Sequence, residues 1–254
     1  MKAKFQMPNA GCRIEKQQRR DFVIRHSSFD LRAFTLIELL TVIAIIGVLA
    51  ALLFTSLKGI KRKQYIQNAT AEMEQLETAI DRYKAAYGFY PPDNATNALF
   101  NPLYFELLGT TNIGGNSPEY QSLDDVTIKL FPSDLKAIFG TSGFMNCSKP
   151  GSAEDARAAQ NFLPGLKPGQ ISPYFTNNEP NGFKMLITSV GGPDVAYNPL
   201  GMNGAAGINP WRYNSSNPTN NPGAYDLWVQ LSISGRTNLV CNWSRQVQLN
   251  SPLP

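Results

Sequence analysis

One apolar stretch limits what this chain can fold into more than any other feature. Residues 34–57 read FTLIELLTVIAIIGVLAALLFTSL, and these twenty-four residues carry a single charge, Glu38. At about 1.5 Å of rise per residue, a helix of this length reaches roughly 36 Å, whereas the hydrocarbon core of a bilayer is about 30 Å thick. The stretch therefore predicts a helix that spans a membrane.

Glu38 is unusual inside such a helix. A charged side chain near the bilayer centre costs about 2.5–3.5 kcal/mol on insertion scales, so this carboxylate needs a partner or a place at the membrane edge. It falls in the first turn, where the helix dipole favours a carboxylate and where the side chain can reach the interface. Taken alone, Glu38 is compatible both with a carboxylate that has a partner inside the membrane and with a carboxylate at the membrane edge.

Charge is distributed unevenly along the chain. Residues 1–33 contain eight Lys/Arg and three Asp/Glu, and the remainder contains fifteen and sixteen, so the first part carries +5 and the rest −1. By the positive-inside rule this leader stays in the cytoplasm and the remainder is exported. The basic excess is therefore no sign of a nucleic-acid partner. The leader also lacks the apolar core of a secretory signal, and Met7 is an alternative start to Met1.

The helix is predicted to continue well beyond the apolar stretch. From Ile66 to Tyr87, apolar residues recur at spacings of three and four, and no Pro or Gly interrupts residues 60–87. This pattern predicts one helix from near Thr35 to Tyr87, amphipathic in its second half and ended by Gly88. The apolar stripe suits a coiled-coil seam with another chain. We favour packing on the chain's own domain, because a folded domain must bury apolar surface.

The residues around the start of the apolar stretch resemble a known export signal. RAFTLIELL, residues 32–40, followed by TVIAIIGVLAA, resembles the amino-terminal signal of the type IV pilin superfamily. The resemblance implies that a prepilin peptidase cuts between Ala33 and Phe34 and methylates the new amine of Phe34. It also implies that Glu38 neutralises the amine of a neighbouring subunit as subunits assemble. The family usually has Gly before the cut, so Ala33 is a departure. Alanine is the next smallest residue, and we therefore expect cleavage to survive at a lower rate.

A second resemblance narrows the family. Residues 67–94, QNATAEMEQLETAIDRYKAAYGFYPPDN, look like the major pseudopilins of type II secretion systems. This implies a helical polymer of identical subunits, with a prepilin peptidase, a secretion platform, minor pseudopilins and a secretin as further partners. It also implies a single-pass protein of the bacterial inner membrane, with the leader cytoplasmic and the carboxyl-terminal domain periplasmic or outside.

The remaining chain predicts an α+β domain. Short helices are expected at residues 99–109 and 133–139, and strands at 126–131 and 183–190, followed by a Gly-, Pro- and Asn-rich loop at 191–223. Alternating apolar residues from Leu227, and a second run after Gly235, predict a β-hairpin. We thus expect a long amino-terminal helix packed on a carboxyl-terminal antiparallel sheet with long loops. The expected parts are a cleaved leader (1–33), a membrane-spanning or filament-core helix (34–57), its amphipathic continuation (58–90) and an exported globular domain (91–254).

Residue types argue against catalysis. The only histidine, His26, and Cys12 lie in the leader, so the mature chain has no Ser-His or Cys-His pair. Cys147 and Cys241 are candidates for a disulfide, which would contribute about 4 kcal/mol in the chain-entropy model, and two unpaired thiols are the alternative. Neither a phosphate-binding loop nor a nucleic-acid patch is visible. We expect no enzyme and no cofactor.

Calcium is left open by the sequence. Residues 209–214, NPWRYN, and 225–228, YDLW, resemble pseudopilin segments, and in that family a nearby loop often coordinates calcium. Residues 235–254 contain no Asp or Glu. Asp226 or Asp194 could supply oxygens, but calcium takes six to eight. The ligands of any metal are therefore unknown at this point.

Together these features predict a pilin-like structural subunit that a prepilin peptidase processes and that assembles into a type II secretion pseudopilus. The nearest alternative is a type IV pilus subunit for adhesion, motility or DNA uptake. A membrane-anchored protein whose Asn-rich loop binds surface ligands, or a membrane-anchored enzyme, are the others.

Overall fold

The computed structural model describes residues 35–113, 119–124, 131–149, 157–173, 175–176, 182–190, 197–202, 204–233 and 235–249. The side chains of residues 53–59 lie outside this description, as do the leader, Ala33 and Phe34. The chain divides into two compact units, Met1–Ala51 and Leu52–Pro254.

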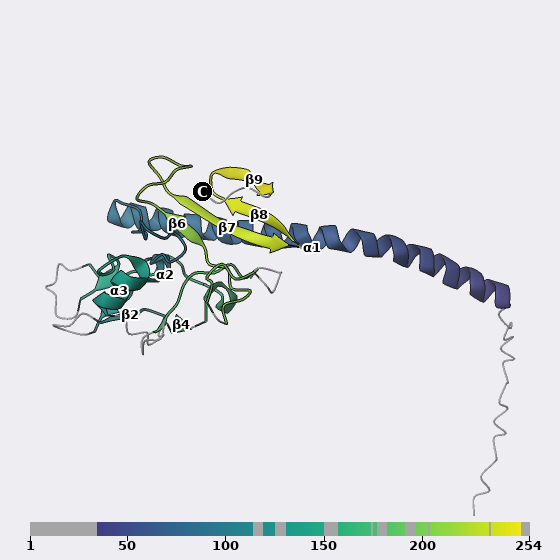
Figure 1. Ribbon diagram of the computed structural model, residues 1–254, viewed down its shortest axis with the longest axis horizontal. Helices are drawn as coiled ribbons and strands as arrows, with labels where there is room; N and C mark the ends of the chain where they lie inside the picture. The colour runs from purple at the N-terminus through teal and green to yellow at the C-terminus, as the bar shows by residue number, and fades with distance from the viewer. Residues whose placement is uncertain are drawn as a thin grey trace, which may run out of the picture. The chain divides into compact units, whose positions relative to one another are not determined.

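A single helix, α1, runs from Leu36 to Tyr87 (Figure 1). Its sequence contains no proline, and it ends where Gly88 takes a φ of 84°, a left-handed conformation that glycine adopts without a steric penalty. The N–H of Gly88 donates to the carbonyl oxygen of Lys84 at 2.7 Å, which satisfies a carbonyl of the last turn. The prediction of one helix ending at Gly88 is confirmed.

The first unit contains the beginning of α1. Its apolar side chains are exposed on every side of the helix, from 81% for Leu36 to 45% for Val42. Within the residues that the structure describes, no helix combines the length and the apolar character needed to cross a membrane. The structure therefore does not support the membrane-spanning part of the prediction for residues 34–57.

The second unit is built around a four-stranded antiparallel sheet, with order β6-β7-β8-β9 (Figure 1). The strands are β6 (Arg212–Asn214), β7 (Asp226–Ile233), β8 (Arg236–Cys241) and β9 (Ser244–Leu249). Ile233 pairs directly with Arg236, and Gly235 has a φ of 71°, which permits a tight turn. The predicted hairpin is confirmed, with a shorter connection than expected.

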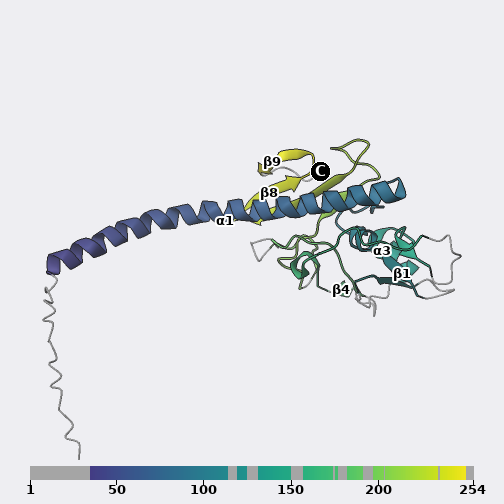
Figure 2. The same ribbon diagram turned by 180° about the vertical axis from the view of Figure 1, so that it is seen from behind.

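The second half of α1 packs on this sheet, and Figure 2 shows the helix in front of it. The alternating residues Leu227, Val229 and Leu231 of β7 face the helix and are fully buried. The apolar stripe of α1 buries against them in one core. The stripe residues in that core are Ala69, Met73, Leu76, Ile80 and Tyr83. The stripe thus packs on the chain's own domain, as predicted.

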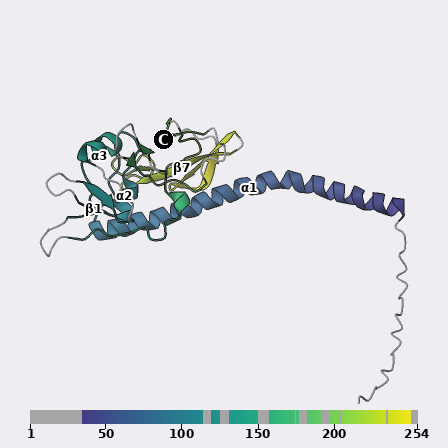
Figure 3. The ribbon, with the colours of Figure 1, turned by 90° about the horizontal axis from the view of Figure 1, so that it is seen from below.

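Smaller elements gather beside the Tyr87 end of α1 (Figure 3). They comprise two helices, α2 (Leu103–Leu108) and α3 (Pro132–Phe139), and a three-stranded sheet in the order β2-β1-β3. The strands of that sheet are β1 (Thr110–Asn112), β2 (Tyr120–Ser122) and β3 (Cys147–Ser148). A short pair, β4 (Phe175–Thr176) and β5 (Gly182–Phe183), and a 3-10 turn, η1 (Pro168–Gln170), complete the described elements.

Two predictions for this region need correction, and one is confirmed. The helix expected at 99–109 starts only at Leu103, after Pro102, whereas the helix expected at 133–139 is present and starts one residue earlier, at Pro132. The strand expected at 183–190 is not continuous: Phe183 pairs with Phe175, whereas Leu186 and Ile187 form isolated bridges with Ile171 and Pro210. Most of its residues are buried, but they change partners, so the apolar run here contributes to the core without forming a regular strand. The strand expected at 126–131 lies outside the described residues except for Phe131.

The Gly-, Pro- and Asn-rich segment 191–223 contains more order than predicted. Among its described residues, Arg212–Asn214 form strand β6, whose residues pair with Trp228, Leu227 and Asp226 of β7. Three residues are too few to show an alternating pattern, and this strand was therefore missed.

Candidate functional site

The beginning of α1 is closed by two residues that hydrogen-bond to each other. The backbone N–H and the hydroxyl of Thr35 both donate to Glu38 Oε2 at 2.8 Å, and the N–H of Glu38 donates to Thr35 Oγ1 at 3.3 Å. This is a capping box, in which two otherwise unpaired amide groups of the first turn are satisfied reciprocally. Its sequence signature, Thr-x-x-Glu, is present in residues 35–38 and was missed in the sequence-based prediction.

The capping box fixes the carboxylate of Glu38 at the positive end of the helix dipole. Oε2 receives both hydrogen bonds from Thr35, and Oε1 has no hydrogen-bond partner among the described residues. Glu38 is exposed. As far as the described residues show, Oε1 is available to bind a cation such as an amine.

Apolar side chains surround this carboxylate. Leu36, Ile37 and Leu39 are between 59% and 81% exposed, and the exposed apolar surface continues along α1 to Leu52. Contiguous exposed apolar surface of this extent marks a site of interaction with another protein or a membrane. The site thus combines one carboxylate, that of Glu38, with a long exposed apolar surface of α1. The predicted cleavage and methylation positions, Ala33 and Phe34, lie outside the described residues.

The two cysteines of the described chain are not brought together. Cys147 lies half-buried in β3, Cys241 lies buried in β8 of another sheet, and both are free thiols. Burial raises the pKa of both thiols above the ordinary value. Neither thiol is placed like a reactive nucleophile, which needs an exposed position and a lowered pKa.

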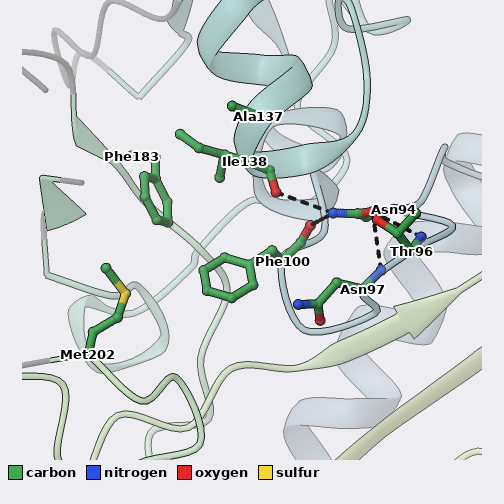
Figure 4. A pocket seen from close by; sticks show the side chains of 8 residues that line it. All are labelled: Asn94, Thr96, Asn97, Phe100, Ala137, Ile138, Phe183 and Met202. Atoms are coloured by element: carbon green, nitrogen blue, oxygen red, sulfur yellow. Dashed lines mark hydrogen bonds between the residues drawn. The ribbon is translucent and has the colours of Figure 1, made fainter. Parts of the chain in front are cut away.

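A pocket of about 380 Å³ lies between the loop after α1, α3 and β5 (Figure 4). Asn94 is at its edge and has every hydrogen bond it can use inside the protein, since it donates to the carbonyls of Phe100 and Ile138. Its Oδ1 accepts from the backbone N–H groups of Thr96 and Asn97. The described lining has no titratable side chain, so it offers no general acid or base.

A buried carboxylate joins α1 to α2. Glu106 has no exposed surface and accepts hydrogen bonds from Tyr83 Oη at 2.9 Å, from the N–H of Met145 at 2.9 Å and from the N–H of Asn146 at 3.1 Å. Burial raises the pKa of Glu106, although these three hydrogen bonds act in the opposite direction. Burial beside this carboxylate also raises the pKa of Tyr83. These donors to Glu106 come from α1 and from the backbone of residues 145 and 146, so this carboxylate holds these segments together and has a structural role.

The start of α1 coincides with a known sequence motif. Residues 32–54 match a family model described as the prokaryotic N-terminal methylation motif. That motif covers α1 from Leu36 to Phe54 and contains both members of the capping box, Thr35 and Glu38.

The curated relatives with similar sequences are core proteins of type II secretion systems. The chain is 46% identical over 63 residues to the type II secretion system core protein G of Escherichia coli (strain K12), covering 25% of this chain and 43% of that protein. The core protein G of Pectobacterium carotovorum subsp. carotovorum is 43% identical over 65 residues, with coverage of 26% and 42%. That of Vibrio cholerae serotype O1 is 40% identical over 67 residues, with coverage of 26% and 46%.

The matches have a clear limit. The chain spans less than half the length of these relatives, and no solved structure matches the chain significantly. The resemblance to pseudopilins is confirmed over about a quarter of the chain.

Proposed function

We propose that this chain is a structural subunit that assembles into a type II secretion pseudopilus. One observation carries the proposal: the methylation motif at residues 32–54 coincides with a helix that starts at Leu36, has a capped glutamate in its first turn and exposes apolar side chains all round. An apolar helix of this kind is stable only in a bilayer or among other apolar helices. Polymerisation of this chain would supply other apolar helices for it to pack against.

Processing would create the group that Glu38 binds. A prepilin peptidase cuts after Ala33 and methylates the amine of Phe34, which places a cation at the end of an apolar rod. A buried cation without a partner costs several kcal/mol, and a carboxylate of the neighbouring subunit removes that cost. Oε1 of Glu38, which accepts no hydrogen bond from a described residue, is suited to this contact. The pair would set the axial register between subunits.

Before assembly, residues 34–57 would be held in the bacterial inner membrane. The support is the sequence itself, in which twenty-four nearly uninterrupted apolar residues follow a leader of net charge +5. The leader would then be cytoplasmic and the globular domain periplasmic or outside. The partners are further copies of this chain, a prepilin peptidase, a secretion platform, minor pseudopilins and a secretin.

Mass spectrometry of the mature amino terminus tests the processing step. In cells that supply a prepilin peptidase, we expect a first peptide that begins with N-methyl-Phe34, and an intact leader when the peptidase is inactivated. Ala33→Gly should increase the fraction cleaved at early times, because it restores the residue usual in the family. Recovery of the full leader from cells with active peptidase, or a cut inside α1, would refute the proposal.

A type IV pilus subunit is the closest competing function, since it would share the processing and the helix. The names of the relatives favour secretion. Deleting the gene distinguishes the two functions by the process that is lost. Loss of an exported enzyme from the medium indicates a pseudopilus, and loss of surface adhesion or motility indicates a pilus.

A further inference from the structure

The pseudopilin resemblance implies a calcium site near Asp226, and the residues present do not fit one. We infer that the loop between β6 and β7, residues 215–225, is closed by two carboxylates of this chain, Asp226 and Asp93, and that its order does not depend on calcium. The inference concerns the folded domain alone, so it holds whether or not the chain polymerises.

Asp226 binds one side of the loop. It is 1% exposed, and its Oδ2 accepts from the backbone N–H groups of Thr219 and Asn220 at 2.9 Å each and from Asn220 Nδ2 at 3.1 Å. Its Oδ1 accepts from the N–H of Asn221 at 2.9 Å. Three successive amide groups thus converge on one carboxylate, which is the geometry of a backbone anion-binding nest.

Asp93 binds the other side of the same loop. Its Oδ2 accepts from the N–H of Ser215 at 3.0 Å, from the N–H of Ser216 at 3.1 Å and from Ser216 Oγ at 2.9 Å. The side chain of Asn214 adds a bond, since its Oδ1 accepts from the N–H of Asn217 at 3.0 Å. The loop is therefore held by anions that come from outside it.

These contacts exclude the usual chemistry of a calcium site. Calcium binds six to eight oxygens. Here both carboxylate oxygens of Asp226 and Oδ2 of Asp93 face N–H and O–H donors, whose positive ends would repel a cation. Residues 215–225 contain no Asp or Glu of their own. Residues 235–249, which also contain none, form β8, β9 and the turn between them. In the described part of the chain, no group of three or more His, Cys, Asp or Glu side chains is placed to hold a metal ion.

Charge and burial both strengthen the hydrogen bonds that hold the loop. Hydrogen bonds to a charged acceptor are about twice as strong as neutral ones, and burial of Asp226 shields them from water. Asp226 is also part of β7, and its Cα partner in β6 is Asn214, so the two ends of the loop are joined by the sheet itself.

The test uses the full-length chain in detergent, with excess calcium chloride or with EDTA. A calcium site filled at about a hundred times its dissociation constant would raise the melting temperature by roughly 5–10 °C. We expect no rise, and equal hydrogen-exchange protection of the peptide covering residues 214–226 under both conditions. Asp226→Asn turns one acceptor into a donor that faces other donors. It should reduce that protection at least about tenfold and lower the melting temperature by roughly 5 °C, with or without calcium.

Glu74→Gln is the matched control, because it likewise converts one carboxylate to an amide, at an exposed position of α1. It should leave the protection of residues 214–226 unchanged. Calcium-induced protection of this peptide in the wild type, lost in Asp226→Asn, would overturn the inference and assign Asp226 to a metal site. Unchanged protection in Asp226→Asn would overturn it in the other direction, since the carboxylate would then not hold the loop.

Discussion

Glu38→Gln is expected to reduce polymer formation more than about a hundredfold while leaving the start of α1 folded. Glutamine at this position preserves the capping box with Thr35, so the helix end keeps its hydrogen bonds. Only the charge is lost. The amine of the neighbouring Phe34 would then be buried without a counter-ion, which costs about 3–5 kcal/mol per contact. Each 1.4 kcal/mol is a factor of ten in affinity, hence the expected loss.

Thr35→Ala provides the complementary control. It removes the hydroxyl that bonds to Glu38 but leaves the carboxylate in place. Loss of a helix cap costs about 0.5–2 kcal/mol, confined to the first turn, so polymer yield should fall only a few-fold. Yield is measured by sedimentation of sheared filaments, after normalising for cleaved subunit. If Glu38→Gln polymerised as well as the wild type, the amine–carboxylate pairing would be wrong. If Thr35→Ala were the more severe change, the cap would be the essential feature.

Glu106→Ala should have the largest effect on folding of the globular domain. It leaves the hydroxyl of Tyr83 and the N–H groups of Met145 and Asn146 buried without an acceptor. Unsatisfied buried donors cost about 1–3 kcal/mol each, so we expect a loss of about 3–5 kcal/mol in the free energy of unfolding and a drop of roughly 10 °C in melting temperature. Glu74→Ala, at an exposed position of the same core helix, should stay within about 0.5 kcal/mol of the wild type.

The pH dependence of the same site provides a second measure. Burial raises the pKa of Glu106 above its ordinary value of 4.5. The folded state therefore holds the proton more tightly than the unfolded state. Stability from this group is present below pH 4.5 and is lost as the pH rises through the raised pKa. Measured by urea unfolding, the stability of the wild type relative to Glu106→Gln should fall over that interval. A relative stability that rises instead would mean that the three hydrogen bonds outweigh burial and lower the pKa.

Periodicity is what made much of the fold predictable. The stripe from Ile66 to Tyr87 places apolar residues on one face of a helix, and the alternation from Leu227 to Ile233 places them on one face of a strand. Both faces are buried in the core, and both the helix and the strand are present as predicted. The apolar run at 183–190 misled because burial alone does not specify pairing. Its residues meet three different segments, a tertiary arrangement that no local pattern encodes.

The site was predictable where the chemistry is local. Glu38 was identified from its place in the apolar stretch, and the cap by Thr35 could have been found from Thr-x-x-Glu. Glu106 could not, because a single acid within an apolar segment gives no sign of the amide groups that reach it from residues 145 and 146. The same holds for Asp226, whose partners become neighbours only when the loop folds back. Contacts made by backbone amides cannot be predicted from residue types, because every residue except proline carries the same N–H group.

Polymer recovery with active and with inactivated prepilin peptidase tests most directly whether this chain is a subunit freed for assembly by cleavage. Cells carrying the chain, an assembly platform and either form of the peptidase would be sheared, and the filaments sedimented. We predict filaments only with the active peptidase, built of chains that begin at Phe34. Filaments of the uncleaved chain, or a cleaved chain that stays monomeric in the membrane, would contradict the account.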